Sequence, residues 1–366
     1  MKTKTLRKKF AACVAATAVG VSLTFGTPAP TSAAIFDDVL EIGLSAAAVS
    51  AQVDQSIRLY NDTEDGRQSL YQAFRKEYGV NNDPTLNARL SSIMTNLTKA
   101  VATYDETVYE KPYLYFVSAD KSLNAACAMG HVMMVNTGAF DYLSTDDEIA
   151  AVVGHEMGHG QRDHVAKGQK KNITKQVVAL IGNQVAGDTL ITQTVGKVLL
   201  DHSVAHGSRK FETEADNLAW DYITRTNYNP GACAAVMQKF VEMGSGNRSA
   251  LEKVFIPSDH PDSDKRRDNY VKKLYEYSKK HATAKDGVIK VNGKIFTTAA
   301  ETSKMSSASR AYFVLGNLAA AYHNGHNTSA ATVRNGTVYL GEQAIITPIA
   351  GDEDAYTLAE RLNSIK

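Results

Sequence analysis

The chain has 366 residues, of which 43% are hydrophobic and 22% are charged. This is the balance of an ordinary globular protein, so it excludes a wholly disordered chain. A chain of this length can hold one sizeable core, or a main domain together with a smaller one.

The first 34 residues have the order of regions found in an export signal. The basic stretch MKTKTLRKK precedes the apolar run FAACVAATAVGVSLTF, and a segment rich in small residues and proline follows. We expect a signal peptide over residues 1–34, cleaved after Ala34, and therefore a periplasmic or extracellular protein. The alternative is an uncleaved membrane anchor, although the apolar run is short for a spanning helix.

Removal of this segment leaves 35 basic against 39 acidic side chains, a net charge of −4. This charge gives no electrostatic case for binding nucleic acid. Cys127 and Cys233 remain, and we expect them to be buried thiols, although an exported protein could also pair them. No later segment reaches about 18 uninterrupted apolar residues, so the mature protein is expected to be soluble.

The elements before the central motif mix helices and strands. Residues 36–76 are expected to be helical with a break near Asp65-Gly66, and a second helix is expected over residues 83–104. A strand is expected over residues 113–117. After a turn at Gly130 comes another strand, formed by His131, Val132, Met133, Met134, Val135 and Asn136.

The next helix carries the stretch VGHEMGHG and has a clear start. Thr145 and Glu148 have the spacing of a capping box. Residues i and i+4 of a helix share a face, so His155 and His159 can present two nitrogens to one metal ion. Glu156 is rotated by about 100° from His155 and can reach a metal-bound water. The alternative is a pair of surface histidines beside a salt-bridged glutamate.

The rest of the chain is expected to be mainly helical and then mixed. Helices are expected over residues 174–200, 208–225 and 230–244, followed by a polar bridge over residues 279–287. A hairpin then turns at Asn292-Gly293, and a helix covers residues 308–322. Short strands near residues 332–333, 338–340 and 344–347 precede a last helix over residues 352–365. We find no repeat of fixed period.

A catalytic zinc site needs a third protein ligand as well as an open position. Val165 stands where the longer pattern of some zinc proteases has a histidine, and His164 falls on the opposite helix face. His202 and His206 form a second pair spaced by four residues and are candidates, although they lie close to a helix break.

The other candidate for the third ligand lies in the segment RKFETEAD. Glu212 and Asp216 share one helix face there, opposite an apolar stripe, whereas Glu214 is rotated by about 200° from Glu212 and should point elsewhere. On the residues alone, this carboxylate pair and the histidine pair both remain open.

At this point the sequence resembles metallopeptidase family 48, which contains the HtpX heat-shock protease, Oma1 and the CAAX prenyl proteases. The resemblance covers residues 82–270 in five ordered blocks: Leu123-Asn124-Ala125 with Gly130 and the strand after it; His155, Glu156 and His159; Arg209, Glu212, Ala215 and Asp216; Tyr228-Asn229-Pro230; and Ser258-Asp259-His260-Pro261 with Arg266. The segment 126–129, Ala-Cys-Ala-Met, departs from the family pattern, so the substrate-facing strand is expected to differ in shape. The chain also lacks the family's transmembrane helices and resembles its soluble, exported branch.

The fold class is expected to be α+β, with two parts. The resemblance implies a mainly helical zincin-type metallopeptidase domain, with a small β-sheet and an edge strand, over residues 35–282. The tail lies outside the resemblance, and its expected strands and helices predict a small α+β domain of unknown role over residues 283–366. The substrate would be a polypeptide in unfolded or misassembled envelope proteins, and the edge strand 131–136 would bind it as an added strand.

The resemblance also implies one Zn²⁺ per chain, held by His155, His159 and Glu212 with a water completing the site. Glu156 would act as general base, taking a proton from that water and passing it to the leaving amine. Asp216 would orient a ligand histidine, or else form a helix salt bridge. Arg209 would pair with a site carboxylate, or else be solvated.

His260 would donate a hydrogen bond to the developing oxyanion or lean onto the metal, or else be a turn histidine before Pro261. The alternative function is a non-catalytic, zinc-containing chaperone or assembly factor. Glu156 argues against it, because a pure binder has no need of a general base. The oligomeric state stays open, and a peripheral contact with the cell envelope is one option for the C-terminal part.

Overall fold

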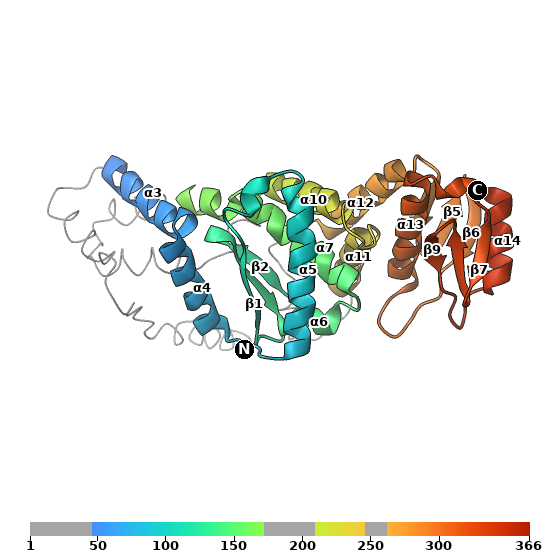
Figure 1. Ribbon diagram of the computed structural model, residues 1–366, viewed down its shortest axis with the longest axis horizontal. Helices are drawn as coiled ribbons and strands as arrows, with labels where there is room; N and C mark the ends of the chain where they lie inside the picture. The colour runs from blue at the N-terminus through green and yellow to red at the C-terminus, as the bar shows by residue number, and fades with distance from the viewer. Residues whose placement is uncertain (1–45, 172–208, 246–261) are drawn as a thin grey trace, which may run out of the picture. The chain divides into compact units, whose positions relative to one another are not determined.

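The computed structural model describes residues 46–171, 209–245 and 262–366 (Figure 1). The expected signal peptide and the helix expected over residues 174–200 therefore lie outside the described residues, as do His202, His206 and His260. Within the described ranges, helices accompany three small three-stranded sheets, so the expected α+β class is confirmed.

Two helices open the described chain, α3 (Ala46–Asp62) and α4 (Glu64–Tyr78). The break between them lies at Thr63 and not at the expected Asp65-Gly66. The Thr63 hydroxyl caps α4 by accepting a hydrogen bond from the Gly66 amide at 3.1 Å. Gly66 serves a close helix crossing instead of a turn, because a Cβ there would stand 2.0 Å from the Leu59 carbonyl oxygen.

The first sheet contains β1 (Leu114–Ser118), β2 (Ala125–Ala128) and β3 (Val132–Asn136). Its order is β1-β3-β2, with β3 parallel to β1 and antiparallel to β2. The strand expected at residues 131–136 is therefore central, and the expectation that it is the edge strand is wrong. The sequence does not predict β2, because this strand consists of alanine and cysteine and lacks the β-branched and aromatic residues that favour strands.

The turn between β2 and β3 is a short 3₁₀ helix (Met129–His131), so His131 lies outside the strand. Both Gly130 and His131 have positive φ, at 68° and 57°. The turn is fastened to the N-terminal helices, because the Gly130 amide donates to Asn61 Oδ1 at 2.9 Å and Arg67 Nε donates to the Gly130 carbonyl at 2.7 Å.

Among the described residues, six further helices pack on this sheet or on one another. The expected helix near residues 83–104 is α5 (Pro84–Ala102), which the Asp83 carboxylate caps. The others are α6 (Thr137–Tyr142), α7 (Asp146–Gln161), α10 (Arg209–Ile223), α11 (Ala232–Ser245) and α12 (Ser263–Tyr277). The helix α7 contacts α5, α10, α11 and β2, so it lies at the centre of this part. The helix α12 was not expected, because its buried residues are few and most of its side chains are charged or polar.

Six strands and two helices follow. They are β4 (Ala282–Lys285), β5 (Val288–Val291), β6 (Lys294–Thr298), α13 (Ser307–His323), β7 (Ala331–Arg334), β8 (Thr337–Leu340), β9 (Gln343–Ile346) and α14 (Ala355–Ile365). The hairpin, the two helices and the three late strands agree with expectation. The polar bridge expected over residues 279–287 is wrong in its second half, because β4 alternates buried alanines with polar side chains.

These elements form two copies of one unit. Each copy is an antiparallel three-stranded meander followed by a helix: β4-β5-β6-α13 and then β7-β8-β9-α14. The segments ATAKDGVIKV, from Ala282, and ATVRNGTVYL, from Ala331, align without gaps at a separation of 49 residues. The sequence therefore does contain a repeat, hidden because the copies share alternation and turn residues more than identities.

Each helix packs on strands of both copies. The helix α13 contacts β4, β5 and β9, and in the symmetric arrangement α14 contacts β7, β8 and β6. Figure 1 shows the strands of both copies between α13 and α14. The helix α13 also packs against α11 and α12. Because residues Ser45–Lys366 form one compact unit, the expected domain boundary at residue 282 stays a prediction.

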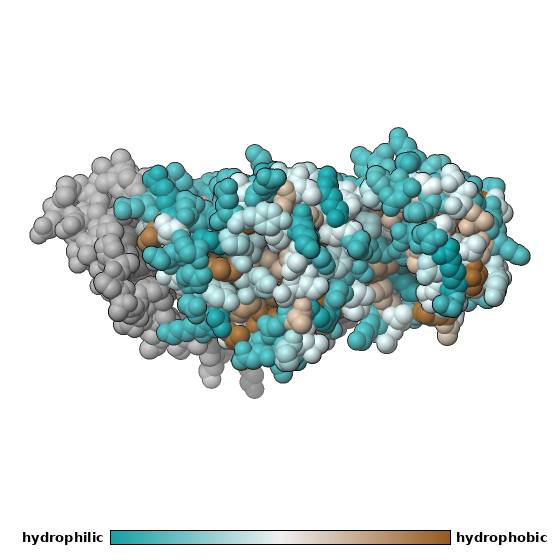
Figure 2. Space-filling model, viewed as in Figure 1, coloured by the Kyte–Doolittle hydropathy of each residue, from teal (hydrophilic) through white to brown (hydrophobic). Residues whose placement is uncertain are grey.

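Buried hydrophobic side chains from α5 through α14 form one continuous cluster. On the face shown in Figure 2, hydrophobic residues appear in small, separate areas. Cys127 and Cys233 are buried free thiols, as expected. None of the helices in the described ranges combines the length and apolarity that a bilayer crossing requires.

Candidate metal centre

The helix α7 carries both histidines of the motif, and its start is firmly held. The Glu148 amide donates to the Thr145 hydroxyl at 3.2 Å, and the Glu148 carboxylate accepts from the Thr145 amide at 3.1 Å. The expected capping box is therefore confirmed. Glu148 is also fully buried, with Lys239 Nζ of α11 at 2.7 Å from its Oε1. The helix is thus tied to α11 as well as to its own cap.

The helix α10 crosses α7 at close range, and small residues make the crossing possible. A Cβ at Gly158 would stand 3.0 Å from the Cα and the carbonyl oxygen of Ala215. Glu212 and Asp216 lie one turn apart among the buried residues of α10, as their spacing predicts. The crossing therefore brings the carboxylates of α10 to the histidines of α7.

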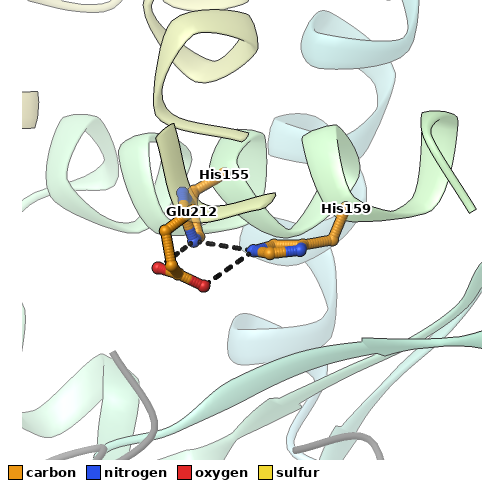
Figure 3. Close-up of side chains that lie close together, drawn as sticks. All are labelled: His155, His159 and Glu212. Atoms are coloured by element: carbon orange, nitrogen blue, oxygen red, sulfur yellow. Dashed lines mark hydrogen bonds and ion pairs between the residues drawn. The ribbon is translucent and has the colours of Figure 1, made fainter. Parts of the chain in front are cut away.

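Figure 3 shows His155 and His159 projecting from α7 toward the carboxylate of Glu212. The two histidine Nε2 atoms are 3.1 Å apart. His155 Nε2 lies 3.6 Å from Glu212 Oε2, and His159 Nε2 lies 3.3 Å from Glu212 Oε1. Two ligand atoms of a tetrahedral zinc ion, each about 2.1 Å from the metal, are separated by roughly 3.4 Å. The three donors, all buried, therefore fit a zinc ion.

The buried charges around these donors also favour a divalent cation. Glu156, Glu212 and Asp216 bring three carboxylates, and Arg266 of α12 brings one guanidinium; all four residues are buried. With the histidines neutral and the carboxylates ionised, the cluster has a net charge of −2. Uncompensated charge is costly in a protein interior, and one divalent ion would neutralise it.

Asp216 lies behind His155, on the side away from Glu212. The Nδ1 atom of His155 is 3.0 Å from Asp216 Oδ1, and this contact directs Nε2 toward the other donors. Burial alone would raise the pKa of Asp216, but the Arg266 guanidinium and hydrogen bonds from His155 and Arg266 hold the pKa of that carboxyl well below its usual range. Asp216 is therefore an anion.

Glu156 points toward the first sheet, and its Oε2 accepts a hydrogen bond from the Cys127 amide of β2 at 3.0 Å. That amide therefore points out of the sheet edge, and the edge of β2 faces the site. Burial, together with the nearby Glu156 carboxylate, raises the pKa of the Cys127 thiol well above its usual value. The thiol is consequently protonated and chemically quiet.

An apolar pocket of about 40 Å³ opens beside His155 and Glu156. Its walls come from the start of β2, from α7 and from α11, and they include Ala125, Ala151, Val236, Met237 and Phe240. A cavity that holds a single water has a volume of about 10–15 Å³, so the pocket suits one small or medium aliphatic side chain.

Arg209 is not at the site. Its side chain is 81% exposed, and its Nε lies 3.5 Å from Asp262 Oδ2. The expectation that it pairs with a site carboxylate is therefore wrong. The reason is its place on the exposed face of α10, while Arg266 reaches the same carboxylates from α12.

His164 is much closer to the site than expected. The helix α7 ends at Gln161, and the chain then turns so that His164 Nδ1 lies 3.0 Å from His159 Nδ1. The expectation that His164 lies on the opposite face is wrong, because it requires α7 to continue past Gln161. Glu214 points elsewhere, as expected, and pairs with Arg162 and His164.

The sequence motifs gave Arg266 no role in the site, although the periodicity of its helix indicates a buried arginine. Arg266, Tyr270 and Leu274 recur every four residues and are the buried residues of α12. An arginine in line with buried positions needs a buried acidic partner. The role of the Cys127 amide shows no such signal in the sequence. Its direction toward Glu156 depends on how β2 pairs with β3.

Comparisons with known proteins agree with this geometry. The family model described as Peptidase family M48 matches residues 84–273, more than half of the chain. Metalloprotease LoiP of Escherichia coli K12 is 26% identical over 182 residues, which cover 49% of this chain and 69% of that protein. Mitochondrial metalloendopeptidase OMA1 of Arabidopsis thaliana is 31% identical over 122 residues, which cover 33% of this chain and 24% of that protein.

A third relative is the beta-barrel assembly-enhancing protease of Escherichia coli O157:H7, which is 21% identical over 231 residues. The match covers 60% of this chain and 44% of that protein. The chain thus spans less than half the length of the second and third relatives.

Proposed function

The chain belongs to peptidase family M48 and is therefore a metallopeptidase, and on that premise we propose that it is a zinc-dependent endopeptidase. The supporting observation is the group formed by His155, His159 and Glu212, whose donor atoms all lie within 4.8 Å of one another. Two imidazoles and one carboxylate are a donor set of catalytic zinc sites, which keep a further position open.

The chemistry follows from the residues around this group. When bound, the ion supplies Lewis acidity, which lowers the pKa of a water and polarises a carbonyl. The Glu156 carboxylate accepts a proton from the attacking water and then returns it to the leaving amine. The Cys127 amide orients this carboxylate, and Asp216 orients His155. A hydrogen bond from His260 to the developing oxyanion stays a prediction.

The substrate chain is proposed to lie along β2, not β3. The strand β2 is at the edge of its sheet, and its Cys127 amide points to Glu156. An extended polypeptide can add to such an edge through main-chain hydrogen bonds, with little dependence on sequence. One side chain beside the cleaved bond would enter the apolar pocket next to His155.

We further propose that the substrates are unfolded or misassembled proteins of the cell envelope. Two observations support this: the signal-like order of residues 1–34, and the name of a relative that enhances β-barrel assembly. The same observations support a periplasmic or extracellular location.

One substitution tests the catalytic role. Glu156→Gln should keep its bound zinc but cleave unfolded casein about 10²–10⁴-fold more slowly than wild type, because the amide cannot accept the proton. Glu360→Gln, which alters an exposed glutamate of α14, should retain activity. Equal cleavage by Glu156→Gln and wild type would refute the role of Glu156 as general base. No cleavage by zinc-loaded wild type would refute the protease in favour of a non-catalytic assembly factor.

The third ligand is tested separately by zinc content. Glu212→Ala should lose most of its zinc after dialysis against a weak chelator. Full zinc retention by this variant would redirect the assignment to His202 and His206.

A further inference from the structure

Arg266 reaches from α12 into the metal centre and contacts both carboxylates of α10. Its Nη1 lies 3.1 Å from Glu212 Oε2. Its Nε and Nη2 donate to Asp216 Oδ2 and Oδ1 at 2.8 and 2.7 Å. The side chain is only 8% exposed, so water screens these contacts little. One guanidinium thus joins a proposed metal ligand to the residue behind His155.

The contacts of Nε and Nη2 with Asp216 determine where the third nitrogen of the Arg266 guanidinium, Nη1, lies. A guanidinium is planar, and its donors form a rigid fork. Two of those donors hold Asp216, and the Tyr270 hydroxyl donates to Asp216 Oδ1 at 2.9 Å. Rotating the fork would leave a buried carboxylate without its cation, which is strongly destabilising. Nη1 is therefore fixed beside Glu212.

This arrangement makes the two oxygens of Glu212 unequal. Oε1 lies 3.3 Å from His159 Nε2, whereas Oε2 is held by Arg266 and lies 3.6 Å from His155 Nε2. A carboxylate oxygen that is ion-paired with a cation has part of its negative charge neutralised, so it is the weaker donor to a metal. Oε1 is consequently the better donor.

We propose that Arg266 restricts Glu212 to binding the metal ion through Oε1 alone. This inference rests on the metal site of the proposed function and adds a positioning role for Arg266. A carboxylate bound through both oxygens would occupy two coordination positions. A carboxylate held to one oxygen leaves a position for water or for the substrate carbonyl, as catalytic zinc sites require.

The test reads coordination directly, not activity. Cobalt(II) replaces zinc in the full-length protein, and its visible d–d bands are intense at four-coordinate sites and weaken as the coordination number rises. Wild type should show intense bands. Arg266→Met releases Oε2 to the metal, so its bands should lose intensity. Arg266→Lys keeps the charge, but its single ammonium cannot hold both carboxylates, so its bands should also weaken.

Tyr270→Phe is the matched control. It removes the two hydroxyl contacts to Asp216, one to Oδ1 and one to the main-chain carbonyl oxygen, and leaves Arg266 in place beside Glu212, so it should keep the wild-type bands. Bands that weaken as much in Tyr270→Phe as in Arg266→Met would overturn the inference, because support of Asp216 would then explain the change. Unchanged bands in Arg266→Met would overturn it as well.

A second measurement uses wild type alone, so it tests the inference even if the Arg266 variants do not fold. X-ray absorption of the zinc-loaded wild type should show one carboxylate oxygen at bonding distance, and two would overturn the inference. Failure of wild type to bind cobalt or zinc would instead refute the metal site, and with it the proposed function.

Discussion

His131 is a buried histidine in a left-handed backbone conformation, with φ at 57°. Its Nδ1 lies 2.8 Å from the Lys111 carbonyl oxygen, and its ring stacks on Tyr113 at a centroid distance of 4.5 Å. Burial, together with the nearby Lys111 charge, lowers the pKa of His131 to about 4. The imidazole is therefore neutral at physiological pH.

A pH dependence of stability follows from this pKa. Histidine in an unfolded chain titrates near pH 6.5, so between pH 6.5 and 4 the unfolded chain binds the extra proton. The contribution of neutral His131 is complete above pH 6.5 and is lost as the pH falls toward 4, up to about 3 kcal/mol. His131→Asn tolerates the positive φ and removes this titration. Urea unfolding at pH 7 and pH 4.5 should show a smaller loss in the variant, and equal losses would contradict the prediction.

At the residue scale, helix geometry was enough to predict part of the site. The spacing of His155, Glu156 and His159, and that of Glu212 and Asp216, each lie within one helix, where periodicity fixes the shared face. Arg266 and the Cys127 amide reach the site only through tertiary packing, which a single sequence does not display. For the same reason the sequence does not show that Arg266, and not Arg209, pairs with the carboxylates of α10.

The crossing of α7 and α10 decides, at the element scale, whether the donors meet. A Cβ at Gly158 would stand 3.0 Å from Ala215 Cα and its carbonyl oxygen, which are backbone atoms, so the helix α10 itself would have to shift. Gly158→Ala should therefore push α10 away, cost roughly 1–3 kcal/mol of stability and weaken zinc binding. Thermal unfolding and chelator competition would measure the two effects.

Gly154→Ala on the same helix is the control. Its Cβ would meet nothing closer than 3.7 Å, so alanine should be tolerated and should gain up to about 1 kcal/mol of helix propensity. Wild-type zinc affinity in Gly158→Ala would show that the close crossing does not place Glu212.

Elements with local signals were predictable, and those without were not. The helices α5 and α7 have side-chain caps and helical periodicity, and the hairpin at Asn292-Gly293 has turn residues with positive φ. The strands β2 and β4 are short and rich in alanine, and α12 is largely charged, so their states depend on their neighbours.

Asn229 joins the two parts of the molecule at the largest scale. Its amide donates to Asp147 Oδ1 near the start of α7 at 2.9 Å. Its side chain donates to the Phe313 carbonyl and to Asn317 Oδ1 of α13 at 3.0 and 2.9 Å. The C-terminal units are thus hydrogen-bonded, through one residue, to the helix that carries the histidines.

Gly316 allows this junction to close. A Cβ there would stand 1.9 Å from Asn229 Oδ1 and 2.4 Å from the Gly231 amide nitrogen. Gly316→Ala should therefore lower the free energy of unfolding by about 1–3 kcal/mol through overpacking. Gly244→Ala in α11, where a Cβ would meet no atom within 4 Å, should melt at or slightly above the wild-type temperature. Equal melting temperatures for the two variants would contradict the prediction.

The α+β class could be predicted for the whole molecule, but the duplication in its C-terminal part could not. The two copies agree in where strands alternate and where they turn, and such patterns are shared by many unrelated strands. The repeat is recognised from the structure, because the two copies have the same strand pairing and corresponding helix contacts.

The exchanged packing of α13 and α14 has a consequence for how this region can be divided. Each helix rests on the third strand of the other copy, so a single copy would lack part of its own core. Two separate copies would have to find each other in solution, and their association would depend on concentration. Joining them in one chain makes that encounter intramolecular, at a high effective concentration. Cutting between the copies should therefore return the region to the behaviour of a dimer.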